Sequence, residues 1–396
     1  MQCPPSCPNG STDKVDMKHA VLLTLCLTPV VLSLAACGGG DDEVATEDTM
    51  ATAAEAESET ANAAGGGLAK TLAARATINR PRVSPSPAPA PAPATAAGAS
   101  VAERIAAATA TAQSSTNACA PVRPFYWEIG SRDGKQASGS VNSTSSTVTV
   151  TSTMPITLAS ASKWIYGAYV AQKRNGVLSS DDRAFLSMRR GYNSFESCLQ
   201  NQTVAACQAY GTNGVYTAST DNKFDYGGGH MQKHASSLMG LGAMNSKTLA
   251  GAIQSQIGTD VKLAYSSPQL AGGGIASPAA YALFLRKLLT GQLVMGNLLG
   301  SNPVCTNKLT CGTTQAIFAP IPPTESWHYS VGHWVEDDPV LGDGAFSSPG
   351  AFGFYPWIDA SRTTYGVLAR VAPMGAFDSV QCGRLIRKAW TSATAL

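Results

Sequence analysis

The feature that most limits what this chain can fold into is a sharp change of composition near Asn117. All six tryptophans and all twelve tyrosines of the 396-residue chain lie after this point. Before it, Ala, Thr, Ser and Glu dominate and prolines alternate with small residues. Such a segment offers too little apolar surface to offset the entropy lost on ordering it. We therefore predict a disordered, partly polyproline-like tether over 37–118, with at most a marginal helix at 101–110, and a folded domain over 119–396.

The N-terminus has the pattern of an export signal. Met17 begins a short cationic stretch, and an apolar run follows from Ala20 to Ala36. A cationic start, an apolar core and small residues before a cleavage position are typical of a secretory signal peptide. The sequence therefore predicts a signal peptide over 1–36, with the true start of the protein at Met17, and export of the domain.

The apolar run ends in Leu34-Ala35-Ala36-Cys37, which resembles a bacterial lipobox. The resemblance implies that Cys37 carries lipid and becomes the mature N-terminus, so a membrane is an expected partner. With Gly38 after the cysteine, the resemblance favours the outer membrane, with the domain in the periplasm or facing outward. An uncleaved apolar anchor and an unlipidated signal peptide remain the alternatives.

Charge and motif searches exclude several functions. Charged residues make up 14% of the chain and the net charge is +2, which gives no electrostatic reason to expect nucleic acid as a partner. The glycine-rich run at 272–274 lacks the Gly-Lys-Ser/Thr of a phosphate-binding loop. His230 and His234 have helical spacing, but Met231 stands where a zinc protease has glutamate and no third ligand is evident. No cofactor and no metal are predicted, and the oligomeric state is left open.

Six cysteines lie within the predicted domain. An even number in an exported chain indicates disulfides formed in an oxidising compartment. Six cysteines allow about 15 pairings, and spacing favours one of them. Cys198 with Cys207 and Cys305 with Cys311 are the local pairs, so Cys119 with Cys382 would tie the two ends of the domain together.

Ser160 and Lys163 open a stretch of helical pattern. The stretch runs to about Arg174 and stops at Asn175-Gly176, a pair typical of helix ends. A separation of three residues places the two side chains on one helix face, one turn apart. A serine hydroxyl becomes a strong nucleophile when a neighbouring base takes its proton, and a lysine amine can be that base. The helix N-terminus also supplies N–H groups for an oxyanion.

The spacing alone is weak, because Ser11 and Lys14 share it and because a serine can simply cap a helix above a solvated lysine. The flanking sequence over 160–192, including Asn-Gly-Val-Leu-Ser-Ser-Asp-Asp, resembles the serine β-lactamase/penicillin-binding-protein superfamily. It is most similar to the branch of class C β-lactamases, family VIII-type esterases and nylon-oligomer hydrolases. The resemblance implies an α+β fold: an antiparallel sheet packed by N- and C-terminal helices, with a helical subdomain inserted between early and late strands.

A second motif of that branch, Tyr-x-Asn, has its counterpart at Tyr226, whose hydroxyl the resemblance assigns to moving the nucleophile's proton to the leaving group. Gly228 stands where the family has asparagine, at a substrate-binding position. The asparagine holds an amide substrate, so its loss puts β-lactamase activity in doubt. The alternative is an ordinary half-buried tyrosine before a glycine turn.

A third motif, Lys-Thr-Gly or His-x-Gly, has its counterpart at Ser348-Pro349-Gly350. The resemblance places Ser348 and Gly350 at the substrate and gives Ala351 a backbone N–H that completes the oxyanion hole with that of Ser160. Ser348 replaces a cation that binds a substrate carboxylate, which also favours an uncharged ester or amide. The alternative is a simple hairpin.

Other elements are expected from local pattern. His333 and Trp334 lie in an aromatic run and are predicted to line the cleft. Trp164 is expected in the core, the 267–278 loop is interpreted as structural, and Glu325 and the acidic residues at 336–338 as a solvated turn. Strands are predicted at 125–129, 147–151, 329–335 and 365–371, and helices at 160–174, 278–289 and 381–390.

Together the motifs predict a serine hydrolase in which Ser160 attacks a carbonyl, Lys163 takes its proton and Tyr226 relays that proton. The expected substrate is a small or oligomeric uncharged ester or amide. A β-lactamase or D-Ala-D-Ala carboxypeptidase is the rival within the same chemistry. A catalytically inactive cell-envelope binding lipoprotein is the rival from another class.

Overall fold

The structure is a computed structural model that describes residues 98–396. The predicted signal peptide, the lipidation position Cys37 and most of the predicted tether lie outside the described residues. Over the part of the chain that is described, no helix has both the length and the apolar character needed to cross a bilayer.

An antiparallel sheet of eight strands forms the centre of the domain, in the order β2-β1-β13-β12-β11-β10-β9-β7. The first strand pairs with the last, with Trp127 opposite Leu368, so the two ends of the domain meet in the sheet. The strands are β1 Phe125–Ser131, β2 Gly134–Val141, β7 Val304–Cys305, β9 His328–Tyr329, β10 Trp334–Glu336, β11 Ala345–Ser347, β12 Tyr355–Ile358 and β13 Thr364–Ala369.

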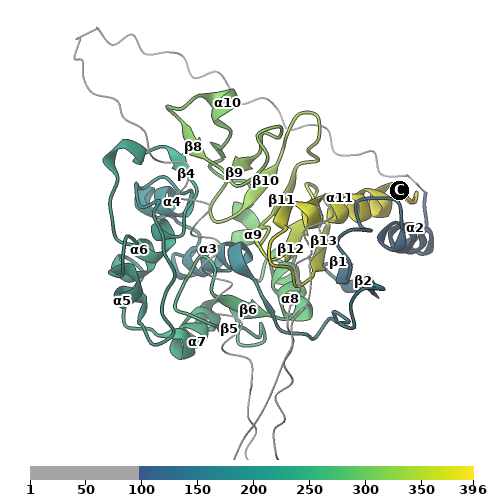
Figure 1. Ribbon diagram of the computed structural model, residues 1–396, viewed down its shortest axis with the longest axis horizontal. Helices are drawn as coiled ribbons and strands as arrows, with labels where there is room; N and C mark the ends of the chain where they lie inside the picture. Colours follow the sequence, from purple (N-terminus) through teal and green to yellow (C-terminus); the bar gives the residue numbers. More distant parts are fainter. Residues whose placement is uncertain (1–97) are drawn as a thin grey trace, which may run out of the picture. The chain divides into compact units, whose positions relative to one another are not determined.

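Helices cover both faces of this sheet (Figure 1). The helices α2 (Val101–Gln113) and α11 (Ala376–Ser392) pack together on one side, and α8 (Pro278–Leu289) packs on β1, β12 and β13 from the other. All of β12, and β13 after its first residue, is buried. A strand buried along its whole length needs apolar cover on both faces, which explains why these strands do not alternate between apolar and polar residues.

Between β2 and β7 the chain builds the helical subdomain, which lies beside the sheet with α3 at the junction (Figure 1). The first ten residues of α3 are all buried, so this helix belongs to the core of both parts. The remaining elements are β3 Ile156–Thr157, η1 Ala159–Ala161, α3 Ser162–Lys173, α4 Ser180–Leu186, α5 Val204–Gln208, η2 Ala218–Thr220, β4 Phe224–Asp225, α6 Gly229–Ser237, α7 Ser246–Ile257, β5 Ala264–Tyr265, β6 Gly274–Ala276, α9 Met295–Leu298, α10 Lys308–Cys311 and β8 Ala316–Phe318.

Local sequence explains where several helices begin and end. The hydroxyl of Ser277 caps α8, and Pro278 occupies its first turn, where a missing N–H costs nothing. After α3 the chain turns away at Asn175 and Gly176, which have φ values of 49° and 80°. Asparagine and glycine tolerate this left-handed conformation better than other residues, as the sequence predicted.

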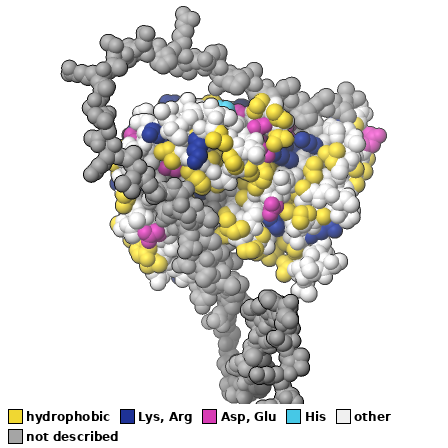
Figure 2. Space-filling view, turned by 45° about the horizontal axis from the view of Figure 1, so that its top comes forward, with side chains coloured by type: hydrophobic (Ala, Val, Ile, Leu, Met, Phe, Trp, Pro, Cys, Tyr) yellow, Lys and Arg dark blue, Asp and Glu magenta, His cyan; other side chains and the backbone are white. Residues whose placement is uncertain are grey.

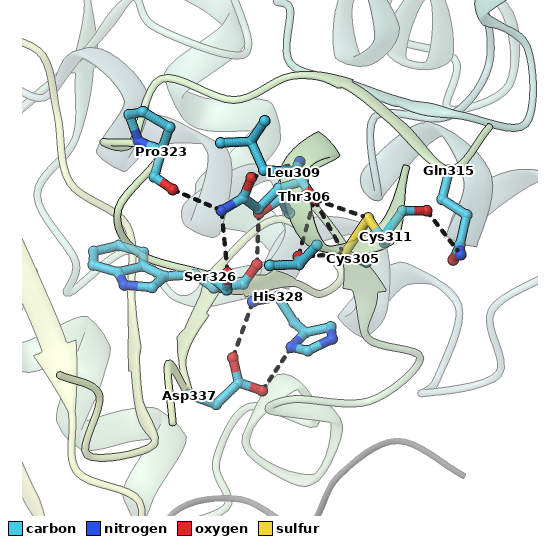
Figure 3. Close-up of a disulfide and its surroundings, with 12 residues drawn as sticks. Cys305, Thr306, Leu309, Cys311, Gln315, Pro323, Ser326, His328 and Asp337 are labelled. Atoms are coloured by element: carbon cyan, nitrogen blue, oxygen red, sulfur yellow. Dashed lines mark hydrogen bonds and ion pairs between the residues drawn. A yellow bond between two sulfur atoms is a disulfide. The ribbon is translucent and has the colours of Figure 1, made fainter. Parts of the chain in front are cut away.

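All three predicted cysteine pairs are bonded in the structure. Cys119–Cys382 joins the segment before β1 to α11, with 4.6 Å between Cα atoms. Cys198–Cys207 closes a loop of the helical subdomain. Cys305–Cys311 closes the turn between β7 and the end of α10 (Figure 3). The first bridge therefore links segments far apart in sequence, and the other two close short loops.

The domain begins earlier than predicted. Helix α2 lies within the segment that composition assigned to a disordered tether over 37–118. A capping box between Ser100 and Glu103 starts the helix, and its small buried residues, Ala107, Ala108 and Ala112, pack towards α11. An isolated helix of this length is marginal in water, so its stability comes from the partner that only the folded chain provides.

Two strand predictions were wrong. The segment 147–151 is not a strand, and the strand that pairs with β1 is β2, which follows a tight turn at Gly134. The predicted single strand over 329–335 is two strands, β9 and β10, joined by a turn in which Gly332 has a φ of 84°. Both segments carry β-favouring residues, and register with neighbouring strands decided the outcome.

The acidic residues interpreted as a solvated turn are instead partly buried and paired. Glu325 and Glu336 lie in the core, where Arg384 bonds to both carboxylates at 2.8–3.0 Å. Burial alone would raise the pKa of Glu336, but the guanidinium groups of Arg387 and Arg384 hold it down at about 2. This network connects α11 to the sheet, and a buried charge without a partner would be far less tolerable than a solvated one.

Removing Arg387 tests how strongly the fold depends on these ion pairs. Arg387 bonds to Asp343 and Glu336 at 2.8–2.9 Å and to the Tyr355 hydroxyl at 2.7 Å. We expect Arg387→Met to lower the free energy of unfolding by about 3–5 kcal/mol, because the buried Asp343 loses its ion-pair partner and Glu336 loses one of its two. Urea titration of the oxidised protein measures this, with the exposed neighbour Lys388→Met as the control. A loss below about 1 kcal/mol would mean that the network contributes little.

Candidate active site

A pocket of ≈ 340 Å³ opens where the sheet meets the helical subdomain. Ser160 and Lys163 lie in its wall, together with side chains from both parts of the fold. Apolar groups dominate this wall, and Figure 2 shows a described surface on which hydrophobic side chains outnumber charged ones. The lining residues are Ser160, Lys163, Asn193, Phe195, Tyr226, Gly227, Gly228, Gln269, Phe318, Pro320, Ile321, Trp327, Trp334, Pro349, Ala351, Met374, Gly375, Ala376, Phe377, Asp378 and Val380.

Ser160 and Lys163 form a buried hydrogen-bonded pair. Lys163 Nζ lies 2.8 Å from Ser160 Oγ and donates a second hydrogen bond to the carbonyl oxygen of Ala271 at 3.0 Å. The two residues are only 4% and 3% exposed. A serine hydroxyl within hydrogen-bond reach of an amine is the geometry needed to activate a nucleophile.

The sequence predicted that Ser160 lies in the first turn of an α-helix. In the structure it lies in the short 3₁₀ turn η1, just before α3. The preceding residue, Ala159, has a φ of 44°. A non-glycine residue in the left-handed region is held there by its surroundings and is found more often at functional sites. Here the turn follows β3 and places Ser160 Oγ beside Lys163, which lies in the first turn of α3.

Tyr226 lies on the same pocket wall, between β4 and α6. Its ring stacks on Trp334, with centroids 5.5 Å apart, and meets Tyr329 edge-on. Lys163 Nζ lies 4.7 Å from the centroid of the Tyr226 ring. The face of an aromatic ring attracts a cation, so this contact helps to position the lysine side chain.

The segment after β11 reaches the pocket differently from the prediction. The Ser348 hydroxyl donates to the carbonyl oxygen of Ser160 at 2.9 Å, behind the wall. A Cβ at Gly350 would overlap the carbonyl oxygen of Leu158, so only glycine allows this close approach. Ser348 and Gly350 are not among the residues that line the pocket, so their predicted contact with substrate stays a prediction. They hold Ala351, which does line it, against the Ser160 turn.

Of the remaining predicted substrate-binding residues, Trp334 and Gly228 line the pocket and His333 does not. His333 is fully buried, stacks on Trp164 and accepts a hydrogen bond from the backbone N–H of Gly300. Burial lowers the pKa of His333 to about 3, so the ring is neutral near pH 7. The turn at Gly332 reverses the direction of the chain, so β9 and β10 pair as antiparallel strands, which the single-strand interpretation could not anticipate.

Sequence reasoning missed three groups in the site. Asn193 comes from the loop after α4, and Gln269 and the Ala271 carbonyl come from the glycine-rich loop that was interpreted as structural. The position of Gln269 just before several glycines could have indicated a place in the site, because a glycine-rich loop can approach neighbouring backbone closely. Nothing in the local sequence pointed to Asn193.

The other histidines take part in structural contacts. His234 bonds to Asp182 through Nε2 at 2.9 Å and to the Tyr166 hydroxyl through Nδ1 at 2.8 Å. His230 accepts from the backbone N–H of Arg190, and burial lowers its pKa to about 4. Within residues 98–396, no three His, Cys, Asp or Glu side chains are grouped in a way that could hold a metal ion.

Comparison with known proteins identifies structures that share the fold of this chain. No protein-family model matches the chain, and no curated protein matches its sequence. Among solved structures, the chain is similar to EstCE1, a hydrolase with promiscuous acyltransferase activity, at 10% identity over 73% of this chain and 98% of that one, with a TM-score of 0.51. It is also similar to FmtA from Staphylococcus aureus, at 12% identity over 78% of this chain and 95% of that one, with a TM-score of 0.50. A third similar structure is SurE with D-Leu, at 15% identity over 74% of this chain and 76% of that one, also with a TM-score of 0.50. The chain shares a fold with these structures, and its antiparallel sheet flanked by helices is the fold class that the motifs predicted.

Substituting Gly350 tests whether the close approach of this loop shapes the site. We expect Gly350→Ala to slow labelling of Ser160 by a fluorophosphonate by at least about 10-fold, because the added Cβ pushes Ala351 away from the nucleophile. Gly251→Ala is the matched control, since a Cβ at this helical position meets nothing within 4 Å. Equal labelling rates in the two variants would show that the loop position does not matter.

Proposed function

We propose that this chain is a serine hydrolase that forms an acyl-enzyme on Ser160, with small or oligomeric uncharged esters or amides as substrates. The observation that carries the proposal is the 2.8 Å contact between Ser160 Oγ and Lys163 Nζ inside the pocket. A helix cap and a solvated lysine, the structural alternatives, would not bury both groups in one cavity wall.

The first step is attack of Ser160 Oγ on the substrate carbonyl while the neutral amine of Lys163 takes the hydroxyl proton. The Ala271 carbonyl accepts a hydrogen bond from the amine, which holds Lys163 Nζ beside the hydroxyl. As the ammonium forms, the face of the Tyr226 ring stabilises its charge. The lysine is therefore positioned both to accept the proton and to hold it.

The negative charge that develops on the carbonyl oxygen needs N–H donors. The backbone N–H groups of Ser160 and Ala351 are proposed to supply them, as the oxyanion hole. Ala351 lines the pocket, and no acceptor among residues 98–396 is paired with its N–H. One such donor contributes about 3–4 kcal/mol to a transition state.

The Tyr226 hydroxyl is proposed to pass the proton from Lys163 to the leaving group. Water then attacks the acyl-enzyme and releases the acid, with the same groups returning Ser160 to its starting state. The proposed role rests on Tyr226 and Lys163 bordering one pocket. Lys163 Nζ lies over the ring of Tyr226, and among the described residues no hydrogen bond joins the Tyr226 hydroxyl to the Ser160–Lys163 pair.

The charges around the pocket favour an uncharged substrate. Among the described residues, Lys163 and Asp378 are the charged side chains that line it, and Lys163 is engaged with the nucleophile. Ser348 stands where the resembling enzymes have a cation, and here it faces the Ser160 backbone. A substrate carboxylate would thus find no cation of its own, which counts against the β-lactamase and carboxypeptidase alternatives.

Kinetics on two chromogenic substrates test the reaction and its class. We expect turnover of p-nitrophenyl butyrate to exceed that of nitrocefin, to disappear in Ser160→Ala, and to fall about 10²–10⁴-fold in Lys163→Met, since the base is lost. Lys247→Met, an exposed lysine on α7, is the control and should keep full activity. Rapid nitrocefin hydrolysis without ester turnover would support a β-lactamase. Failure of a fluorophosphonate to label Ser160 would support an inactive binding protein.

We also propose that the protein is exported and attached to the outer membrane through lipid on Cys37. The disulfides of the domain support an oxidising compartment. Metabolic labelling with an alkyne fatty acid should mark the wild-type chain and the Cys26→Ser control, but not Cys37→Ser. Label that persists in Cys37→Ser, or that is absent from the wild type, would contradict the anchor.

A further inference from the structure

The disulfide Cys305–Cys311 differs from the other two bridges of the domain in its exposure. Both of its cysteines are partly exposed, and the residues from Lys308 to Thr310 between them are exposed. The four cysteines of the other two bridges are at most 7% exposed. A thiol must approach a sulfur atom to break a disulfide, so Cys305–Cys311 is the most accessible of the three to such an exchange.

This bridge also lies where the backbone has few other restraints. Cys305 ends β7, a strand of two residues at the edge of the central sheet, and Cys311 ends the short helix α10. A short edge strand is held by few hydrogen bonds and opens more easily than the centre of a sheet. The covalent bond is therefore an important restraint on the 305–311 turn.

The chain after Cys311 connects this turn to the pocket. The backbone N–H of Phe224 donates to the Gln315 carbonyl at 2.7 Å, and that of Tyr226 donates to the Phe318 carbonyl at 3.1 Å. Phe318 and Tyr226 both line the pocket. A displacement of Cys311 would therefore reach the backbone contacts that place Tyr226.

Asn307 forms a second connection, from inside the bridged turn. Its side-chain amide donates to the Pro323 carbonyl at 2.9 Å and to the Ser326 hydroxyl at 3.1 Å, and Figure 3 shows both partners near the disulfide. These partners lie between Ile321 and Trp327, which line the pocket. The bridged turn thus holds the pocket wall at two places.

The far end of the 306–327 segment is anchored without the bridge. The backbone N–H of His328 and its Nδ1 bond to the Asp337 carboxylate at 3.0 and 2.8 Å (Figure 3). The Ser326 N–H donates to the carboxylate of Asp338 at 2.8 Å. Opening the bridge would leave these bonds in place, so we expect a displaced pocket wall and an otherwise folded domain.

We infer that Cys305–Cys311 is a reversible redox site that controls the pocket, with the oxidised protein active and the reduced protein impaired. The reactant is a dithiol. Its thiolate attacks one sulfur, forms a mixed disulfide and releases the other cysteine as a thiolate, which takes the proton that the attacking thiol lost. The second thiol then resolves the mixed disulfide, so the protein gains two electrons and two protons and the dithiol becomes a disulfide. The control of activity rests on the proposed hydrolase.

Selective reduction is the first test. Free thiols of the full-length protein are blocked with N-ethylmaleimide, dithiothreitol is added in steps, and new thiols are labelled with iodoacetamide and located by mass spectrometry. We expect label on Cys305 and Cys311 at a dithiothreitol concentration at least about 10-fold below that needed for the four buried cysteines, because access limits the exchange. Equal labelling of all six would contradict the inference.

Activity of the selectively reduced, unalkylated protein is the second test. Dithiothreitol is removed by desalting before the assay, because a thiol would cleave the ester itself. We expect kcat/KM for p-nitrophenyl butyrate to fall at least about 5-fold, because a small displacement of groups in the pocket is costly to the rate. Reoxidation with oxidised glutathione should restore it.

Variants assign the effect to this bridge. The double variant Cys305→Ser/Cys311→Ser should match the reduced wild type and should not respond to dithiothreitol. Leu309→Ser, an exposed change inside the same turn, should keep the wild-type response. A urea titration shows whether the double variant is folded, and the comparison of oxidised and reduced wild type needs no substitution.

The outcomes separate this inference from the proposed function. If the bridge is reduced and kcat/KM does not change, redox control is wrong and the hydrolase stands. If the oxidised protein neither turns over the ester nor reacts with a fluorophosphonate at Ser160, the hydrolase proposal fails and the control of its activity fails with it.

Discussion

The backbone from Leu158 to Ser162 is hydrogen bonded from three separate parts of the chain, and the geometry of the pocket depends on these bonds. The Leu158 N–H donates to the Gly274 carbonyl oxygen, and the Gly274 N–H donates to the Ser162 hydroxyl. The Tyr281 hydroxyl of α8 donates to the Ala161 carbonyl, and the Ser348 hydroxyl donates to that of Ser160. A left-handed residue beside the nucleophile persists only under such support. The subdomain, the sheet and α8 therefore meet at one turn.

That turn explains why the catalytic groups come from distant segments. Lys163 follows from the helix that the turn begins, and Ala271 reaches Lys163 through the same loop that pairs with Leu158. Tyr226 is fixed independently, because its N–H donates to the Phe318 carbonyl of β8, near the turn closed by Cys305–Cys311 (Figure 3). The loop after β11 arrives through a glycine that leaves no space for a side chain. Each group is thus positioned by backbone contacts, which tolerate little change.

The polar groups of the scaffold and those of the pocket differ in how fully they are hydrogen bonded. The ends of the domain are joined by strand pairing between β1 and β13, by Cys119–Cys382 and by the buried carboxylates that Arg384 and Arg387 bond. These polar groups are satisfied within the chain, so they belong to the scaffold. In the pocket, by contrast, Asn193 Oδ1 is buried without a hydrogen-bond partner among the described residues. Unsatisfied groups at a cavity that holds a nucleophile are where a substrate can be recognised.

The sequence by itself determined the features that depend on local spacing and residue type. The Ser160–Lys163 pair, the end of α3 at Asn175-Gly176, the limits of α8 and all three cysteine pairs follow from such rules. The tertiary structure alone decided the start of the domain at α2, the two strands on either side of Gly332, and the burial of His333 behind the pocket. It also placed Ser348 and Gly350 against the backbone around Ser160, and brought Asn193 and Gln269 to the pocket wall. The physical reason is that spacing fixes contacts within one or two turns, whereas packing partners and strand register depend on residues far away in sequence.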